Sequence, residues 1–237
     1  MYHSPLGGRG GKVKRCLTSV VAGAVLAVTI GLPAKAEGQR VNWAGFYAGV
    51  NIGSGWATGT PDTAGAPTLK AKGLVGGAQA GYNWQVGQLV FGPKVEVGFG
   101  NIRGTVYDGN YLNYSGRANA FGSVQARVGV AIGRVLPYVQ GGLAFARSTA
   151  SMNCPQAPFG ICKFTGPFTA SDTKTLTGWT VGGGLEVLLA PNWSAFVEAQ
   201  YANFGKPTYS FITPLGPAAA SSKQELSAVK GGLNFHF

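Results

Sequence analysis

Charge and histidine are scarce in this sequence. Only 11% of its 237 residues are charged, 8 of them acidic, and there are 2 histidines. A soluble domain has about 25% charged residues, so an ordinary water-soluble enzyme is disfavoured. Intrinsic disorder requires high charge and low hydrophobicity, and it is disfavoured because 45% of the residues are hydrophobic. The composition indicates a protein whose surface faces an apolar solvent.

Residues that carry catalytic and metal chemistry are also few. After residue 36 the only histidine is His236, which leaves a Ser–His or Asp–His hydrolase almost no base. Cys154 and Cys162 are the only cysteines in that region, too few for a zinc site. Three consecutive glycines at 182–184 fall within a strand-like pattern, so they do not form a phosphate loop. We therefore predict no catalytic residue, no cofactor and no metal, and expect that the protein is not an enzyme.

The first 36 residues have the order of an export signal. Basic residues at positions 9–15 precede a largely apolar run at 16–32, and residues 34–36 are Ala-Lys-Ala. This order predicts a secretory signal peptide, residues 1–36, followed by a mature domain, residues 37–237. The alternative is an anchor helix, but a run of about 17 residues with several polar positions is short for a membrane span. Cys16 stands at the beginning of the apolar run and not after it, so it is not placed as a lipoprotein cysteine.

Removal of the leader lowers the net charge. The leader holds five of the 19 basic residues and none of the 8 acidic ones, so the charge falls from +11 to +6. The remaining basic residues are scattered, without the cluster that nucleic-acid binding requires. Such a surface can instead meet anionic lipopolysaccharide phosphates, or simply keep exposed loops soluble.

The rest of the chain alternates with a period of two, which is typical of β-strands. In residues 89–100, for example, Val95 and Val97 alternate with Lys94 and Glu96. A run of 18 apolar residues, as a helical span would require, is absent from residues 37–237. The 39 glycines show no collagen period. The alternation recurs in eight segments, which are residues 43–56, 74–85, 89–100, 117–132, 136–147, 175–189, 193–202 and 224–237.

Short and long connections alternate strictly between these segments. The short ones are residues 86–88, 133–135 and 190–192, and the long ones are residues 57–73, 101–116, 148–174 and 203–223. An even number of strands with short turns at one end and long loops at the other is the plan of an outer-membrane β-barrel. We therefore predict an all-β fold, an eight-stranded antiparallel up-and-down transmembrane β-barrel with a polar interior, short periplasmic turns and long extracellular loops.

Alternation alone does not fix which face is inside, and a soluble lipocalin-like barrel gives the same pattern. The polar positions carry too few charges to coat a soluble surface, which favours the membrane barrel. Aromatic residues also gather near the segment ends, where the girdles of membrane barrels lie. They are Tyr82, Trp84, Trp179, Trp193, Tyr201, Phe235 and Phe237. Pro93 lies inside a segment, and its missing N–H predicts a bulge or a local break in the ladder.

Five short stretches, spread in order over nearly all of residues 37–237, carry a family pattern. They are Trp43-Ala44-Gly45-Phe46-Tyr47-Ala48-Gly49, Gly81-Tyr82-Asn83-Trp84-Gln85, Leu136-Pro137-Tyr138-Val139, Gly178-Trp179-Thr180-Val181-Gly182 with Glu186, and Gly232-Leu233-Asn234-Phe235. This set resembles the porin-family outer-membrane β-barrel proteins of alphaproteobacteria, which include major surface proteins of Brucella and rhizobia and haemin-binding proteins of Bartonella. The chain departs from the family at Gln125 and Arg127, where relatives often have an Arg-x-Arg pair, and at its two mature cysteines. These departures concern ligand properties and not the fold.

The last strand-like segment carries a second resemblance. Its pattern resembles the terminal signal that the barrel-assembly machinery recognises, and the residues concerned are Lys230, Gly232, Phe235 and Phe237. Paired aromatic residues on an exposed final strand can augment another sheet edge. The resemblance therefore implies this machinery as a partner, and a lipid-facing last strand would show the same pattern. It also implies that no soluble domain follows the barrel.

The polar positions of the segments supply balanced charges, namely Lys94, Arg127, Lys230, Glu96, Glu186 and Glu198. Side chains fill the interior of an eight-stranded barrel, and an unpaired buried charge costs several kcal/mol. We predict that these six residues form a structural salt-bridge network in the lumen. Four amides lie between them, Gln79, Asn83, Gln140 and Gln200. A proton or small-ion path is the alternative.

The two mature cysteines, Cys154 and Cys162, lie in the long loop 148–174. If the leader directs export, this loop reaches an oxidising compartment. We therefore predict a disulfide between them, in preference to two free thiols, and a loop that is presented with a fixed shape.

Together these features predict a non-enzymatic protein of the bacterial outer membrane. It would contribute to envelope integrity and display its loops to lipopolysaccharide, host surfaces or ligands. The alternative is transport, either passage of small solutes or surface capture of a ligand such as haem, for which Tyr107, Tyr111 and Tyr114 are the candidates. The expected partners are outer-membrane lipids, lipopolysaccharide, the barrel-assembly machinery and surface ligands, and not nucleic acid.

Overall fold

The computed structural model describes residues 41–62, 66–107, 113–155 and 161–237. The predicted signal peptide, residues 1–36, lies outside these ranges. Within them, no helix has both the length and the apolar character needed to cross a membrane.

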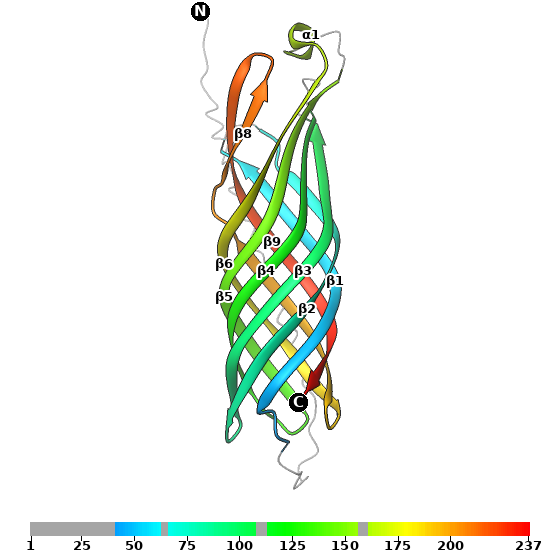
Figure 1. Ribbon diagram of the computed structural model, residues 1–237, viewed down its shortest axis with the longest axis vertical. Helices are drawn as coiled ribbons and strands as arrows, with labels where there is room; N and C mark the ends of the chain where they lie inside the picture. The colour runs from blue at the N-terminus through cyan, green and yellow to red at the C-terminus, as the bar shows by residue number, and fades with distance from the viewer. Residues whose placement is uncertain (1–40, 63–65, 108–112, 156–160) are drawn as a thin grey trace, which may run out of the picture. The chain divides into compact units, whose positions relative to one another are not determined.

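The described residues form nine β-strands and one short helix, α1 (Ile161–Thr165). Eight of the strands make a closed antiparallel ring in the order β1-β2-β3-β4-β5-β6-β7-β9, because β9 pairs with both β7 and β1 (Figure 1). This ring confirms the predicted eight-stranded fold. The strands are β1 (Gly45–Pro61), β2 (Leu69–Val86), β3 (Leu89–Tyr107), β4 (Asn113–Val130), β5 (Val135–Cys154), β6 (Phe168–Ala190), β7 (Trp193–Asn203), β8 (Thr208–Thr213) and β9 (Gly216–His236).

A long ladder between β1 and β9 closes the ring. It runs from the pair Pro61↔Ser222 to the pair Tyr47↔His236. Beyond it, the amide of Phe237 donates to the carbonyl of Phe46 at 3.0 Å. The ring of described strands therefore has no open edge, which is the condition for a sheet in lipid.

The ring is apolar outside and polar inside. On β3, Val97 and Phe99 point outward and are 62% and 73% exposed, whereas Lys94 is 1% exposed. The same arrangement holds on β5, where Leu143 is 60% exposed and Gln140 is 3% exposed. A lipocalin-like barrel would have the opposite polarity, so this alternative is wrong.

Aromatic side chains form two rows on the outer surface. The turn-side row contains the edge-to-face pairs Phe46–Tyr82 and Trp193–Phe235, with ring centroids 4.7 Å and 5.2 Å apart. The loop-side row contains Trp179 and Tyr201, whose ring centroids are 5.5 Å apart. Trp193 and Tyr201 are eight positions apart on β7, about 26 Å along the strand, which suits the apolar band of a membrane barrel.

The strands are longer than the sequence predicts, because they continue into the segments expected to be loops. β5 and β6 stay paired up to Cys154↔Phe168. Above the apolar band, polar cross-strand hydrogen bonds such as Thr149–Thr173, 2.9 Å, hold them together. Serine, threonine and glycine carry no apolar alternation, so the period-two signal ends before the strands do.

The predicted loop 203–223 contains a hairpin that the sequence did not reveal. Its first strand, β8, pairs only with β9, on the long-loop side of the ring (Figure 1). Tyr209 and Phe211 of β8 are 3% and 4% exposed and pack against Ala170 of β6. The hairpin therefore adds a small apolar core outside the ring.

Pro93 breaks one ladder and leaves the other intact. Between β2 and β3 the pairing lapses from Gly81↔Lys94 to Trp84↔Phe91, yet the register is the same on both sides. Between β3 and β4 the pairing runs through Pro93↔Ala126 without interruption. Of the two predicted outcomes, the structure has the local break and not the bulge.

The apolar exterior predicts that a new charge destabilises the protein more inside the apolar band than outside it. Val95 points outward from β3, midway between the aromatic rings of Phe91 and Phe99, and is 48% exposed. Val95→Arg should cost about 2–4 kcal/mol of unfolding free energy in lipid vesicles, because the charge would sit at the bilayer midplane. The control is Ile212→Arg, at a position on β8 that is 88% exposed outside the band. Urea unfolding of the refolded proteins measures both, and equal costs would contradict the orientation.

Candidate functional site

The six predicted network residues lie together inside the ring. They come from β3, β4, β6, β7 and β9, and their side chains are nearly free of solvent contact. The side chains of Lys94, Glu96, Arg127, Glu186, Glu198 and Lys230 are 1%, 10%, 2%, 0%, 0% and 5% exposed. They divide into two clusters along the axis of the barrel.

The loop-side cluster consists of Lys94, Glu96, Glu198 and Lys230. Glu198 bridges both lysines, with Oε2 2.9 Å from Lys94 Nζ and Oε1 3.0 Å from Lys230 Nζ. Lys230 also pairs with Glu96, whose other carboxylate oxygen lies 3.6 Å from Lys94 Nζ. Two positive and two negative groups therefore neutralise one another in a closed square.

The turn-side cluster centres on Glu186, which pairs with Arg127. The second carboxylate oxygen of Glu186 accepts hydrogen bonds from Ser194 Oγ at 2.5 Å and Asn234 Nδ2 at 2.8 Å. The Nε2 atom of His236 lies 3.3 Å from the same oxygen. Glu186 is thus held on all sides, as a fully buried carboxylate requires.

Tyr138 of β5 connects the two clusters. Its hydroxyl donates to Glu198 Oε2 at 2.9 Å, and the guanidinium of Arg127 lies over its ring, 3.9 Å from the centroid. Gln140 is the next inward residue of β5, two positions from Tyr138. It donates to Glu198 at 3.2 Å and accepts from Lys94 at 3.4 Å. One strand therefore joins a cation on β4 to a carboxylate on β7.

The network reaches every strand of the ring. β1 contributes Asn51, which donates to Glu96 at 3.3 Å, and β2 contributes Gln79, which donates to Asn234 at 2.8 Å. Gln200 of β7 accepts from Lys230 at 2.9 Å. The fourth predicted amide, Asn83, is 1% exposed, but neither of its amide atoms has a hydrogen-bond partner.

Apolar clusters lie on both sides of the charged layer. At the turn end, Trp43 is 1% exposed and packs with Val90 and Leu136. Its indole donates to the carbonyl of Gly133 at 3.3 Å, so it lies across the turn end instead of extending β1 as predicted. On the loop side, Leu176 and the aromatic ring of Phe204 belong to a second apolar cluster. A cavity of about 60 Å³ is lined by residues of this cluster and by Asn51, Glu96, Gln200 and Lys230.

Ser194, His236 and Glu186 place a hydroxyl, an imidazole and a carboxylate together, which the sequence did not predict. The arrangement is not that of a hydrolase, because one nitrogen, His236 Nε2, meets both Ser194 Oγ at 2.9 Å and Glu186. A catalytic histidine uses its two nitrogens for these two roles. Ser194 is also 0% exposed. Strand parity could have revealed the cluster, since Ser194 and His236 share the inward positions of their strands.

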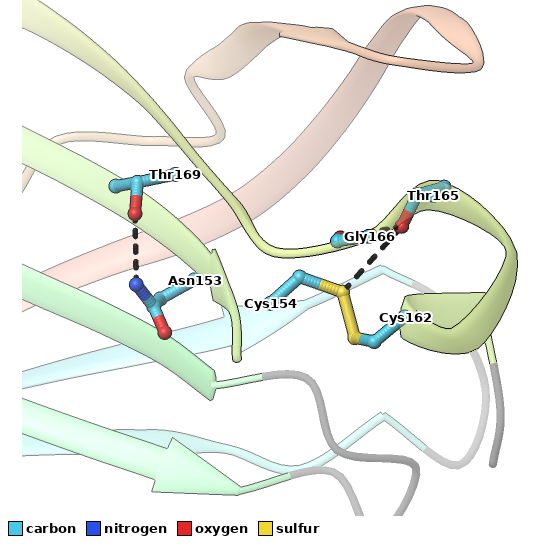
Figure 2. The surroundings of a disulfide bond; sticks show 6 residues. All are labelled: Asn153, Cys154, Cys162, Thr165, Gly166 and Thr169. Carbon is cyan, nitrogen blue, oxygen red and sulfur yellow. Dashed lines mark hydrogen bonds between the residues drawn. A yellow bond between two sulfur atoms is a disulfide. The ribbon is translucent and has the colours of Figure 1, made fainter. Parts of the chain in front are cut away.

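The disulfide candidates, Cys154 and Cys162, are bonded, with Cα atoms 5.6 Å apart. Figure 2 shows the bond between the end of β5 and α1, beside a hydrogen bond of 2.8 Å from Asn153 to Thr169 across β5 and β6. Both cysteines are 1% exposed. The bond therefore ties the tip of the longest hairpin to the sheet below it.

The tyrosines considered for haem do not share a face. Tyr107 points outward and is 51% exposed, whereas Tyr114 packs against the disulfide cluster. Tyr111 lies outside the described residues. Within the described ranges, no group of three or more His, Cys, Asp or Glu residues could hold a metal.

The residues of the predicted assembly signal serve different surfaces. Lys230 belongs to the lumen network, and Gly232 lies against the ring of Phe196, where a side chain would collide. Phe235 and Phe237 pack edge to face with ring centroids 5.1 Å apart, and Phe237 is 75% exposed. Only the two aromatic residues are therefore on the outer surface.

At the loop-side rim, Glu225 pairs with Lys223 at 2.8 Å and accepts a hydrogen bond of 2.5 Å from the hydroxyl of Tyr201. The hydrogen bond from Lys223, with that from Tyr201, lowers the pKa of Glu225 below its ordinary value. This carboxylate is therefore already occupied by neighbours on its own side of the ring.

A closed ring with an apolar exterior, two aromatic rows and a charged interior defines an outer-membrane β-barrel. Residues 22–237 match the family model described as "Outer membrane protein beta-barrel domain", and the chain belongs to this family. It is 30% identical to the 31 kDa outer-membrane immunogenic protein of Brucella melitensis biotype 1, over 93% of this chain and 94% of the relative. It is 28% identical to the 22 kDa outer membrane protein of Rhizobium leguminosarum bv. viciae, over 86% of this chain and 82% of the relative.

Among solved structures, OprG of Pseudomonas aeruginosa is similar in fold, with a TM-score of 0.50 and 15% identity over 82% of this chain and 96% of that chain. The relatives place the protein in the alphaproteobacterial outer-membrane group and in the outer membrane. The short turns are therefore periplasmic and the long loops extracellular.

The turn-side cluster predicts that removing one charge of the Arg127–Glu186 pair lowers the unfolding free energy more than removing both. Glu186→Leu leaves Arg127 buried and unpaired, and should cost about 3–5 kcal/mol of unfolding free energy. The double variant Arg127→Met/Glu186→Leu removes both charges and should be more stable than Glu186→Leu alone. The control is Asp62→Asn, which breaks the exposed Lys206–Asp62 pair of 2.8 Å and should cost less than about 1 kcal/mol. Urea unfolding in vesicles measures all three, and a double variant no better than the single one would contradict the account.

Proposed function

We propose that the protein is a non-enzymatic component of the outer membrane that supports envelope integrity and presents its extracellular hairpins to surface partners. The observation that carries the proposal is the charged layer, to which all eight ring strands contribute a side chain. Cross-links from every strand make the barrel stiff and keep it closed.

The contents of the lumen support a closed barrel. The interior of an eight-stranded barrel is only wide enough for side chains, and here buried ion pairs fill it between two apolar clusters. A solute could pass only if several buried pairs opened together. Each opened pair would leave charges that cost several kcal/mol.

The extracellular hairpins are ordered by contacts of their own, which supports a role in recognition. Two side chains of β6, Asp172 and Lys174, hydrogen-bond to backbone groups of β8. The carboxylate of Asp172 accepts the N–H of Ser210 at 2.9 Å, and the ammonium of Lys174 donates to the carbonyl of Thr208. At the tips, large apolar side chains remain exposed, 83% for Phe164 and 66% for Leu215. Exposed apolar side chains on an ordered segment are typical of surfaces that bind other proteins.

The barrel-assembly machinery is the partner that we propose for the final strand. Before the ring closes, the β9 edge that later pairs with β1 is free to add to another sheet. The outward aromatic residues Phe235 and Phe237 lie at the end of this strand. Outer-membrane lipids are the partners proposed for the apolar band.

A transport role is the second candidate, because polar atoms of the lumen lack partners. Tyr47 Oη and Gln125 Oε1 are buried without a hydrogen bond, and the cavity of about 60 Å³ lies on the loop side of the network. Water bound to such groups could support small-ion passage. Surface capture of haem has less support, since Tyr107 and Tyr114 face different surroundings.

Planar-bilayer recording separates the closed barrel from the pore. The refolded wild-type protein should show no steady conductance, and Lys94→Ala/Glu198→Ala should show a small one because it removes the ion pair of 2.9 Å. Steady wild-type conductance that disappears in Arg127 or Glu186 variants would overturn the proposal in favour of transport.

Complementation of a strain that lacks the protein tests the two parts of the proposed role. A variant in which a two-residue turn replaces residues 208–221 keeps the ring but loses the β8 hairpin. It should restore detergent resistance as wild type does, while adhesion to host or abiotic surfaces stays low. Unchanged detergent resistance in the deletion strain would contradict the envelope role.

A further inference from the structure

We propose that Lys72, Arg103 and Arg117, on the outer face of the barrel, bind the phosphate groups of an outer-leaflet glycolipid. We call these three residues the basic row. The inference rests on the outer-membrane position of the protein and specifies a partner for its proposed envelope role.

The three residues of the basic row are direct cross-strand neighbours. Lys72 on β2 pairs in register with Arg103 on β3, which pairs with Arg117 on β4. Two strand spacings separate the first from the last, about 10 Å. Lys70 lies two residues further along β2, and Arg147 of β5 is diagonal to Arg117, which pairs with Thr149. All five basic residues are exposed.

A local irregularity brings Arg117 into the row. On β4, Ser123, Gln125 and Arg127 point into the lumen and are buried, so strict alternation would turn Arg117 inward as well. The pairing of β4 shifts by one residue at Asn119, on the sides of both β3 and β5. Such a bulge re-aims the following side chains, and Arg117 becomes exposed opposite Arg103.

The basic row has no anionic partner among the described residues. Like charges placed directly opposite on a sheet destabilise it. Every described acidic residue pairs with a cation that does not belong to the basic row. The lumen carboxylates pair with Lys94, Arg127 and Lys230, and the surface carboxylates pair with lysines 174, 206 and 223. The repulsion within the row is therefore not relieved by the described part of the protein.

The position of the row selects a lipid over a free anion. Lys72 pairs in register with Trp56. On the other side, Trp56 pairs with Ser227, which stands opposite Tyr201 of the loop-side aromatic row. Toward the membrane on the same outer face, Leu74 follows Lys72 directly, and Phe99 lies four residues from Arg103, beyond Asn101; Leu74 and Phe99 are 66% and 73% exposed. A molecule with phosphates at the row and acyl chains on the apolar band satisfies both surfaces, as a phosphorylated glycolipid of the outer leaflet does.

The exposed positive charge around the basic row lies on one side of the barrel. At the corresponding level on the other strands, the outward positions are Ser227, opposite Trp56, and Tyr201, opposite Ser227. Thr175 of β6 stands opposite Arg147. The positive charge is thus concentrated on β2 to β5, which describes a binding site and not a uniform belt.

The test compares two triple variants with the same loss of charge. Lys72→Gln/Arg103→Gln/Arg117→Gln neutralises the row, and the control, Arg134→Gln/Lys163→Gln/Lys206→Gln, removes three exposed cations elsewhere. Each refolded protein, in neutral detergent, is titrated with bisphosphorylated lipid A, with dephosphorylated lipid A and with inorganic phosphate. We expect the row variant to bind bisphosphorylated lipid A at least tenfold more weakly than the wild type and the control, and added salt to weaken wild-type binding.

Thermal unfolding gives a second readout that does not depend on binding signals. Without lipid A the row variant should be as stable as the wild type or more so, because the repulsion is gone. With bisphosphorylated lipid A the wild type should become the more stable protein.

Three results would overturn the proposal: equal affinity of the row variant and the control, equal affinity for lipid A with and without phosphates, or binding of inorganic phosphate as tight as that of the lipid. A row variant that unfolds below the wild type without lipid would also contradict it. These outcomes leave the envelope role intact, since that role is tested by detergent resistance of the deletion strain.

Discussion

The pairing of buried charges in the lumen is the constraint on which this structure depends. A barrel in lipid cannot expose its polar side chains outward, so every charge of the membrane-spanning strands must be neutralised inside. Glu198 and Glu186 each meet a cation and several hydrogen-bond donors from other strands. The register of the ring is therefore coupled to the chemistry of its interior, because a one-residue slip would turn these charges into the lipid.

The outer surface follows from the same inversion. The low charge of the chain reflects a lipid-facing exterior and an interior in which charges occur as neutral pairs. The basic row, whose cations have no anionic partner among the described residues, lies at the loop-side rim, where the apolar band ends. There the bulge at Asn119 turns Arg117 outward beside Arg103 and Lys72 instead of adding a further cation to the lumen. Its extracellular position makes this rim the natural place for contacts with other molecules.

Much of this arrangement could be predicted from the sequence, because period-two alternation identifies both the strands and their inward residues. The six network residues were found in this way. Ser194 and His236 were missed as members although both lie at inward positions of their strands, and Trp43 was assigned to a strand although it packs beneath the lumen. The hairpin of β8 was invisible because Tyr209 and Phe211 bury against Ala170, a contact between distant parts of the chain. Alternation also hides a bulge, so the outward turn of Arg117 required the structure.

The most direct test of the account is a double-mutant cycle between Lys94 and Glu198, whose charged atoms are 2.9 Å apart in the middle of the lumen. The free energies of unfolding in vesicles would be measured for Lys94→Met, for Glu198→Leu, for the double variant and for the wild type. If the charged layer holds the barrel together as one network, the coupling energy should be at least about 1.5 kcal/mol. Additivity within about 0.5 kcal/mol would show that the two charges act independently and would contradict the account.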